Sequence, residues 1–400
     1  MRSWLEGTML GGVLGVLDQV EFRTLAAAGL AFATVVLLGK RTIRYLTRLK
    51  MGDSGETDAE ALRAHAASKA NVPTMGGVLI CGAIFLATVL LADVGQFYVQ
   101  LGLLVLVWLT VLGGADDYLK LTASRRGQGR QGLYAWEKLV FQLGIGVLVG
   151  FFLYRHGVGV EQRVNETGEL ITVLNHRTLE HVINLPGQRT YVPGEPSFAD
   201  GLFFLGRWAF ILVALLMVAG MSNAVNITDG MDGLAAGTSG IVAIAIALLA
   251  LIAGAEGIAQ RLLVPSIPVS DELAVMAGAM AGACLGFLWW NCAPAQVFMG
   301  DTGSLALGGL MAYIAIVIRQ EFIVLLMGAV FLIEIASVVI QVGWFKYTRI
   351  TTGTGRRVFR VAPYHHHLHL GGWTENQVVV RLWIVTVLLA IVGLATLKLR

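Results

Sequence analysis

The sequence predicts an all-α polytopic membrane protein, built as a single integral membrane domain over residues 1–400. Its 400 residues are 56% hydrophobic and 14% charged, and the mean hydropathy is +0.72. In a soluble chain, roughly a quarter of all residues are charged, because they must cover its surface. Glycine, which lets membrane helices approach closely, is abundant at 49 residues. This composition excludes a disordered chain, a collagen-like repeat and a typical cytosolic enzyme.

Long, predominantly apolar windows give the expected positions of the membrane spans. Crossing about 30 Å of hydrocarbon takes ~20 apolar residues in a helix. The sequence contains about ten such windows, and no internal repeat that would indicate a solenoid. The windows lie near residues 22–39, 74–92, 97–115, 137–154, 205–224, 234–254, 272–290, 303–319, 322–345 and 379–397.

Lysine and arginine in the connections predict the orientation. Segments 40–73, 116–137 and 346–378 are rich in both residues, so the positive-inside rule makes them cytoplasmic. About ten crossings then place both termini on the periplasmic side. The insert near 155–204 lies outside, and its short alternating pieces allow a small β-hairpin. The full set of cytoplasmic connections is expected near 40–73, 116–137, 225–233, 291–302 and 346–378.

Five aspartates occupy three apolar neighbourhoods at the cytoplasmic ends of the expected spans. Asp116 and Asp117 lie in GGADDYLK, Asp229 and Asp232 in NITDGMDG, and Asp301 in FMGDTGS. A charged Asp costs about 2.5–3.5 kcal/mol at mid-bilayer even on a lenient scale, so such residues indicate function. Each one alone could instead be a helix cap. Convergence of all five on one face favours a shared site.

Neighbouring carboxylates repel each other in a partly dry site unless a cation lies between them. Magnesium suits this role, because it takes a few carboxylate oxygens and shares its other positions with water and phosphates. Asn226, Asp229 and Asp232 are spaced by three and would lie on one side of a helix. The closing glutamate of an EF-hand is missing. We therefore expect bound Mg²⁺.

Cationic residues accompany these acids. Lys69 precedes PTMGG, Lys120 follows the acid pair, and Lys138 begins the fourth window. The last basic connection contains four histidines, which are His365, His366, His367 and His369. Metal-bridged phosphates flanked by Lys and His are typical of phosphoryl transfer.

Two features leave alternatives open. His365 and His369 are four residues apart, which suits zinc on a helix, but His366 stands where a zinc protease has its glutamate. Glu334 lies inside the ninth window, where it could serve a structural role with Gln341 or backbone groups, or a proton or substrate role.

Together these motifs resemble the polyprenyl-phosphate N-acetylhexosamine-1-phosphate transferases. The resemblance covers nearly the whole chain, and the histidine cluster is most similar to the muramoyl-pentapeptide branch. It implies transfer of phospho-MurNAc-pentapeptide from UDP-MurNAc-pentapeptide to undecaprenyl phosphate, giving lipid I and UMP with Mg²⁺. The chain departs from the family pattern at Asn71, Val72 and His369. The matching segments are SKANVPTMGG, DDYLK, SNAVNITDGMDGLA, GFLWWNCAPAQVFMGDTGSLALGG and APYHHHLHLGGW.

The resemblance also implies residue roles. It places metal binding on Asp117, Asp229 and Asp301, and it allows either direct attack or an aspartyl-phosphate intermediate. The implied setting is the bacterial inner membrane, with an active site on the cytoplasmic face, membrane lipids as surroundings, a homodimer and no nucleic acid. The implied catalytic residues are Asp116, Asp117, Asp301, His365, His366 and His367, and the implied substrate-binding residues are Lys69, Thr74, Lys120, Lys138, Asn226, Asp229, Asp232 and Asn291.

Three other functions remain open on the sequence. A UDP-GlcNAc:polyprenyl-phosphate GlcNAc-1-phosphate transferase would use the same acids. A polytopic transporter would place its binding groups near the midplane of the membrane. An intramembrane metalloprotease would contain zinc.

Overall fold

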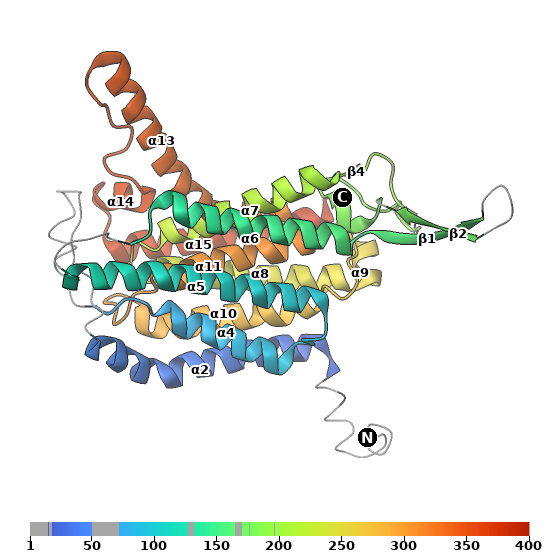
Figure 1. Ribbon diagram of the computed structural model, residues 1–400, viewed down its shortest axis with the longest axis horizontal. Helices are drawn as coiled ribbons and strands as arrows, with labels where there is room; N and C mark the ends of the chain where they lie inside the picture. Colours follow the sequence, from blue (N-terminus) through green and yellow to red (C-terminus); the bar gives the residue numbers. More distant parts are fainter. Residues whose placement is uncertain are drawn as a thin grey trace.

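The computed structural model describes residues 15, 18–49, 72–126, 132–164, 170–175, 177–195 and 197–399, and most of them are helical (Figure 1). Helices dominate because a chain in lipid must satisfy its backbone polar groups internally. In the described chain, eight helices are long and apolar enough to cross a membrane, and two shorter apolar helices accompany them. Each predicted window falls on one or more of these helices.

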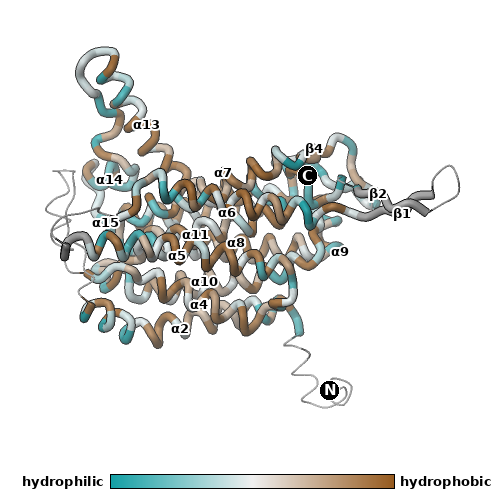
Figure 2. Tube along the Cα trace, viewed as in Figure 1, coloured by the Kyte–Doolittle hydropathy of each residue, from teal (hydrophilic) through white to brown (hydrophobic). Residues whose placement is uncertain are grey.

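The eight long helices are α2 (Val20–Arg48), α5 (Phe97–Arg126), α6 (Ala135–His156), α7 (Arg207–Thr228), α8 (Leu234–Gly254), α10 (Glu272–Asn291), α13 (Ala329–Thr352) and α15 (Glu375–Ala395). The shorter ones are α4 (Gly77–Leu91), α9 (Glu256–Arg261), α11 (Asp301–Val317), α12 (Glu321–Met327) and α14 (Tyr364–His369), with 3-10 turns η3 (Leu179–His181) and η4 (Thr396–Lys398). Figure 2 shows an apolar band through the middle of the bundle and hydrophilic residues gathered toward its two ends.

Helix α11 forms the centre of the bundle, and all of its residues are buried. Glycines allow its neighbours to approach closely. A Cβ on Gly77 of α4 would overlap the backbone of Gly303, and a Cβ on Gly113 of α5 would overlap the backbone of Asp301. Such contacts are typical of membrane helices, where small residues let backbones meet. They fix the amino end of α11 against the carboxyl half of α5.

The ninth window is not one continuous helix. It is divided at Gly328 into α12 and α13, and α13 leaves the bundle at an angle (Figure 1). Apolar side chains on the protruding part are exposed, including Val339 at 65% and Ile350 at 84%. Hydropathy does not reveal this break, because the segments on both sides of Gly328 are apolar.

Several expected connections begin as helix. Helix α2 continues to Arg48 and α5 continues to Arg126, so the acid pair lies within a helix rather than in a loop. These basic stretches retain helical hydrogen bonding beyond the apolar window. Lys69 lies outside the described residues.

A small β-hairpin forms in the 155–204 insert, as predicted. Strands β1 (Gly159–Val164) and β2 (Leu170–Asn175) pair antiparallel. A second antiparallel pair, β3 (Val182–Ile183) with β4 (Phe203–Phe204), was not predicted, since two-residue strands are too short to show alternation. The hairpin extends from the end of the bundle opposite α14 (Figure 1).

Candidate active site

Three of the predicted acids meet where α5 approaches the amino end of α11. Asp116, Asp117 and Asp301 are buried, and each offers a carboxylate oxygen within 4.8 Å of the others. Asp301 is the first residue of α11, where unpaired backbone N–H groups and the helix dipole favour negative charge. The bundle thus brings together acids that lie 184 residues apart in the chain.

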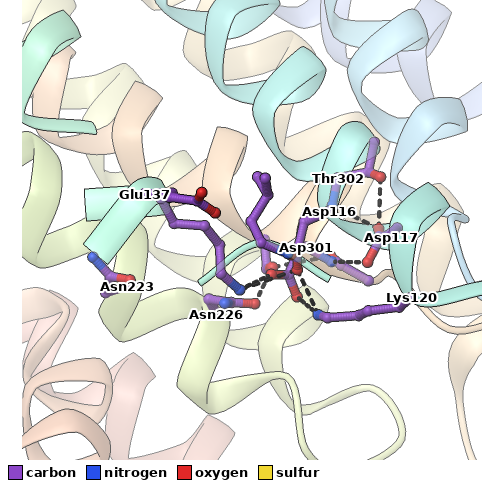
Figure 3. A network of polar contacts seen from close by, with 12 residues as sticks. Asp116, Asp117, Lys120, Glu137, Asn223, Asn226, Asp301 and Thr302 are labelled. Atoms are coloured by element: carbon purple, nitrogen blue, oxygen red, sulfur yellow. Dashed lines mark hydrogen bonds and ion pairs between the residues drawn. The ribbon is translucent and has the colours of Figure 1, made fainter. Parts of the chain in front are cut away.

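Two lysines connect these acids. The Lys120 ammonium lies 2.7 Å from Asp116 Oδ2 and 3.1 Å from Asp301 Oδ1 (Figure 3). The Lys138 ammonium, at the start of α6, lies 3.0 Å from Asp116 Oδ2 and 2.9 Å from Asp301 Oδ2. Each ammonium therefore bridges the same two carboxylates from a different helix. The result is a compact cluster of opposite charges at one end of the bundle.

Asp117 has a different role within the cluster. Its carboxylate accepts hydrogen bonds from the backbone N–H groups of Asp301 at 3.1 Å and Thr302 at 2.9 Å, and from the Thr302 hydroxyl at 2.7 Å. Asp117 therefore caps the amino end of α11 from a neighbouring helix and satisfies donors that the first turn leaves unpaired. Sequence reasoning missed Thr302, although it lies in the quoted FMGDTGS segment.

Gly300 allows Asp117 to reach α11. Its φ is +73°, a conformation that favours glycine, and a Cβ there would meet Asp117 Oδ2 and Thr74 Oγ1. The segment before α11 also pairs with the start of α4, because the Gly76 N–H donates to the Phe298 carbonyl at 2.8 Å. These contacts place Thr74, a predicted substrate-binding residue, beside the acid cluster.

Asn226 and Asp229, at the carboxyl end of α7, also border the cluster. Asn226 Oδ1 accepts a hydrogen bond of 2.8 Å from the Ser304 hydroxyl on α11. The pKa of Asp229 is raised to about 7, because withdrawal from water and the charges of Asp301 and Asp117 oppose its ionisation. The Asp229 carboxyl is also hydrogen-bonded to the backbone of Gly300, the residue before Asp301.

Asp232 and Asn291 hold the backbone beside the cluster. Asp232 Oδ2 accepts from the Ala295 N–H at 2.9 Å, and Asn291 Oδ1 accepts from the Gly233 N–H at 3.0 Å. Asn291 also donates to the Val297 carbonyl at 2.8 Å. These hydrogen bonds connect the turn after α7 to the segment that leads into α11.

A buried polar chain beneath the acids was also missed. Asn223 donates to Gln142 Oε1 at 2.8 Å, Gln142 donates to the Ser222 hydroxyl at 3.2 Å, and Ser222 donates to the Leu305 carbonyl at 3.1 Å. This chain connects α6, α7 and α11. Its signal in the sequence is two amide residues, Gln142 and Asn223, inside windows that are mostly apolar.

The three predicted histidines form α14, but their surroundings differ. His365 is fully buried, and its backbone N–H and ring Nδ1 both contact the Glu334 carboxyl. His366 and His367 are half-buried, and His367 Nδ1 accepts from the Arg360 N–H at 3.1 Å. The partner of Glu334 is thus His365, whereas Gln341 contacts Phe359 and Val358.

The donor set fits a hard divalent cation. Asp116, Asp117 and Asp301 present carboxylate oxygens, the ligands that magnesium and calcium prefer, without the sulfur or paired imidazoles typical of zinc. Asp229 adds a nearby carboxyl with a raised pKa. Among the described residues, this cluster is the only group of acids, histidines or cysteines close enough to hold a metal ion.

Comparison with known proteins agrees with this arrangement. Residues 98–319 match the sequence model of Glycosyl transferase family 4, and this range includes the acid pair, the turn after α7 and Asp301. The chain therefore belongs to this family. It is also 38% identical over 399 residues to the phospho-N-acetylmuramoyl-pentapeptide-transferase of Flavobacterium johnsoniae, and the match covers 96% of each chain.

Proposed function

We propose that this protein transfers phospho-MurNAc-pentapeptide from UDP-MurNAc-pentapeptide to undecaprenyl phosphate in a Mg²⁺-dependent reaction. An oxygen of the lipid phosphate attacks the β-phosphorus of the nucleotide, the diphosphate bridge breaks, and UMP leaves. The product is lipid I, so the reaction is the first membrane step of peptidoglycan synthesis. The similarity to the F. johnsoniae transferase over nearly the full chain supports this substrate pair.

The position of the acid cluster gives the main support for this proposal. An acid cluster bridged by Lys120 and Lys138 lies at one end of an apolar bundle, at the amino end of α11. A lipid phosphate has its tail in hydrocarbon and its head at the membrane boundary, so it can reach this position from the bilayer. A nucleotide diphosphate can reach the same position from water, and a helix amino end attracts phosphate.

Different residues of the site would bind the metal ion, the phosphates and the nucleotide. Asp117, Asp229 and Asp301 would hold Mg²⁺, which when bound offsets the negative charge of the diphosphate. Lys69, Lys120 and Lys138 would neutralise and orient phosphate oxygens. Asp116 would orient the lipid phosphate through the same lysines. Thr74, Asn226, Asp232 and Asn291 would shape the nucleotide side, and His366 and His367 would contact the donor from α14.

The setting follows from the same arrangement. We assign the acid end of the bundle to the cytoplasmic side of the bacterial inner membrane, because the basic connections lie there. We count α12 with α13 as one span and α4 and α11 as spans, which makes ten, and we then expect the start of α2 and the carboxyl end of α15 on the periplasmic side. We also expect the protein to act as a homodimer, as its resemblance to the transferases implies.

One assay of UMP release distinguishes the proposed function from two alternatives. A GlcNAc-1-phosphate transferase would use UDP-GlcNAc, and a transporter would need its polar groups near the middle of the bundle, whereas this cluster lies at one end. Purified protein is incubated with undecaprenyl phosphate and either UDP-MurNAc-pentapeptide or UDP-GlcNAc, with and without Mg²⁺. UMP released only from the first nucleotide, and only with Mg²⁺, supports the proposal. Release of UMP from UDP-GlcNAc but not from UDP-MurNAc-pentapeptide, or from neither nucleotide, would reject the proposal.

A further inference from the structure

His365 differs from its two histidine neighbours in being enclosed by protein. Its exposed fraction is 0%, and its ring Nδ1 lies 3.0 Å from Glu334 Oε2. Its backbone N–H lies 3.1 Å and 3.2 Å from the two Glu334 oxygens. A substrate cannot touch this ring without displacing protein. One buried carboxyl on α13 therefore fixes both the backbone and the ring of the first residue of the histidine cluster.

The other ring nitrogen faces the turn after α7. Because a Glu334 oxygen accepts at Nδ1, the ring hydrogen lies there and Nε2 points away from Glu334. Nε2 is buried and has no hydrogen-bond partner among the described residues. A Cβ added to Gly230 would overlap this nitrogen. The histidine ring thus lies directly between Glu334 and Gly230, the residue after Asp229.

Further contacts fix the same turn against α13 and α15. Met231 and Leu234 form a small buried cluster with Val330, one turn before Glu334 on α13, and with Val378 on α15. Glu375 Oε1 accepts from the Asp232 N–H at 3.1 Å. The turn is therefore supported by apolar contacts, one carboxyl and the His365 ring. It begins at Asp229, whose carboxyl is hydrogen-bonded to the backbone of Gly300, the residue before Asp301.

We propose that Glu334 and His365 are positioning residues that hold the Asp229–Gly233 turn and thereby place the Asp229 carboxylate for a divalent cation. Glu334 orients His365, and the His365 ring supports Gly230 by direct contact. This role rests on the proposed function for the identity of the cation. It assigns His365 to the support of the site rather than to contact with substrate.

The test measures Mn²⁺ binding to detergent-purified protein by electron paramagnetic resonance, with no substrate present. Glu334→Ala should weaken Mn²⁺ binding at least tenfold. Glu334→Gln should weaken it less than threefold, because its amide oxygen can still accept from the ring N–H. Ser337→Ala is the matched control, since Ser337 is buried one turn along α13 and donates only to the Glu334 backbone carbonyl.

A second pair of variants tests the contact between Gly230 and the His365 ring by changing the glycine. Gly230→Ala should displace the His365 ring and weaken Mn²⁺ binding as Glu334→Ala does. Gly220→Ala, on α7 with nothing within 4 Å of its added Cβ, should bind Mn²⁺ like the wild type. If Glu334→Ala does not fold, this pair still tests whether the His365 ring positions the turn.

The outcomes separate this inference from the proposed function. Wild-type protein that binds no Mn²⁺ would reject the metal site itself. Wild-type binding with unchanged binding in Glu334→Ala and Gly230→Ala would reject the positioning role alone. Equal weakening by Ser337→Ala would also overturn it, because the effect would then be a general loss of helix stability.

Discussion

The ammonium of Lys138 lies 2.9 Å from the carboxylate of Asp301, although the two residues are 163 positions apart in the chain. The contact joins the first turn of α6 to the first residue of α11. It requires both helices to begin at the same end of the bundle and at the same depth. In this way the helix arrangement itself assembles the charge cluster.

Removal of this cation should impair turnover more than folding. Lys138→Ala leaves two buried carboxylates with one bridging lysine and removes a positive charge from the diphosphate site. We expect kcat to fall about 100-fold, in the range found when a preorganised electrostatic contact is lost. UMP release at saturating substrate measures it.

Lys398 provides the control, because it lies in η4 at the carboxyl end of the chain, away from the acids. Lys398→Ala should retain wild-type kcat. Equal losses in the two variants would show that Lys138 acts only through the overall charge of the protein.

Replacement of Asp117 should destabilise the protein as well as slow it. Asp117→Asn keeps the side-chain shape but turns one acceptor oxygen into a donor, which in either amide orientation faces a backbone N–H of Asp301 or Thr302. A buried donor left unpaired costs about 1–3 kcal/mol of unfolding free energy. The melting temperature in detergent should fall further than in Thr302→Val, which loses only one hydroxyl contact. An unchanged melting temperature would refute the capping role.

Gly300→Ala tests whether the close approach of Asp117 matters. The added Cβ would meet Asp117 Oδ2 and Thr74 Oγ1, and φ is +73°. Gly353→Ala has a similar φ of +75° but nothing within 4 Å, so it shares the backbone strain without the overlap. We expect activity to fall about tenfold or more only in Gly300→Ala. Similar activity in the two variants would mean that strain alone explains any effect.

The raised pKa of Asp229 predicts a pH-dependent effect of metal. The folded value is about 7, against about 4 in an unfolded chain, so between these values the folded protein keeps a proton that the unfolded chain has lost. The contribution of Asp229 to stability without metal therefore falls as pH rises from 4 to 7. Above pH 7 the carboxylate is free to bind Mg²⁺.

Mg²⁺ should accordingly raise the melting temperature more at pH 8 than at pH 5.5. Asp229→Asn should remove most of this difference, because the amide does not titrate. A Mg²⁺ shift that is the same at both pH values in the wild type would contradict the role of Asp229 as a ligand.

Much of the fold follows from the sequence because hydropathy is a local property. The windows located the helices, the short alternating stretch indicated the hairpin, and Asp116, Asp117 and Asp301 stood out as charges in apolar surroundings. These signals need no knowledge of neighbouring segments in space.

Features that depend on contacts between distant segments were not predictable in the same way. The break at Gly328 has the same hydropathy as an unbroken helix. The pairing of Glu334 with His365 joins residues 31 positions apart, so each residue alone left several roles open. The capping of α11 by Asp117 likewise depends on how closely α5 approaches it.

The most direct test of the account is the rate of Mg²⁺-dependent UMP release by Asp301→Asn, with UDP-MurNAc-pentapeptide and undecaprenyl phosphate as substrates. Like Asp116, Asp301 is contacted by both lysines, and it also begins the central helix. We expect the rate to fall about 1,000-fold or more in a variant that still purifies as a folded membrane protein. Turnover near that of the wild type would contradict it.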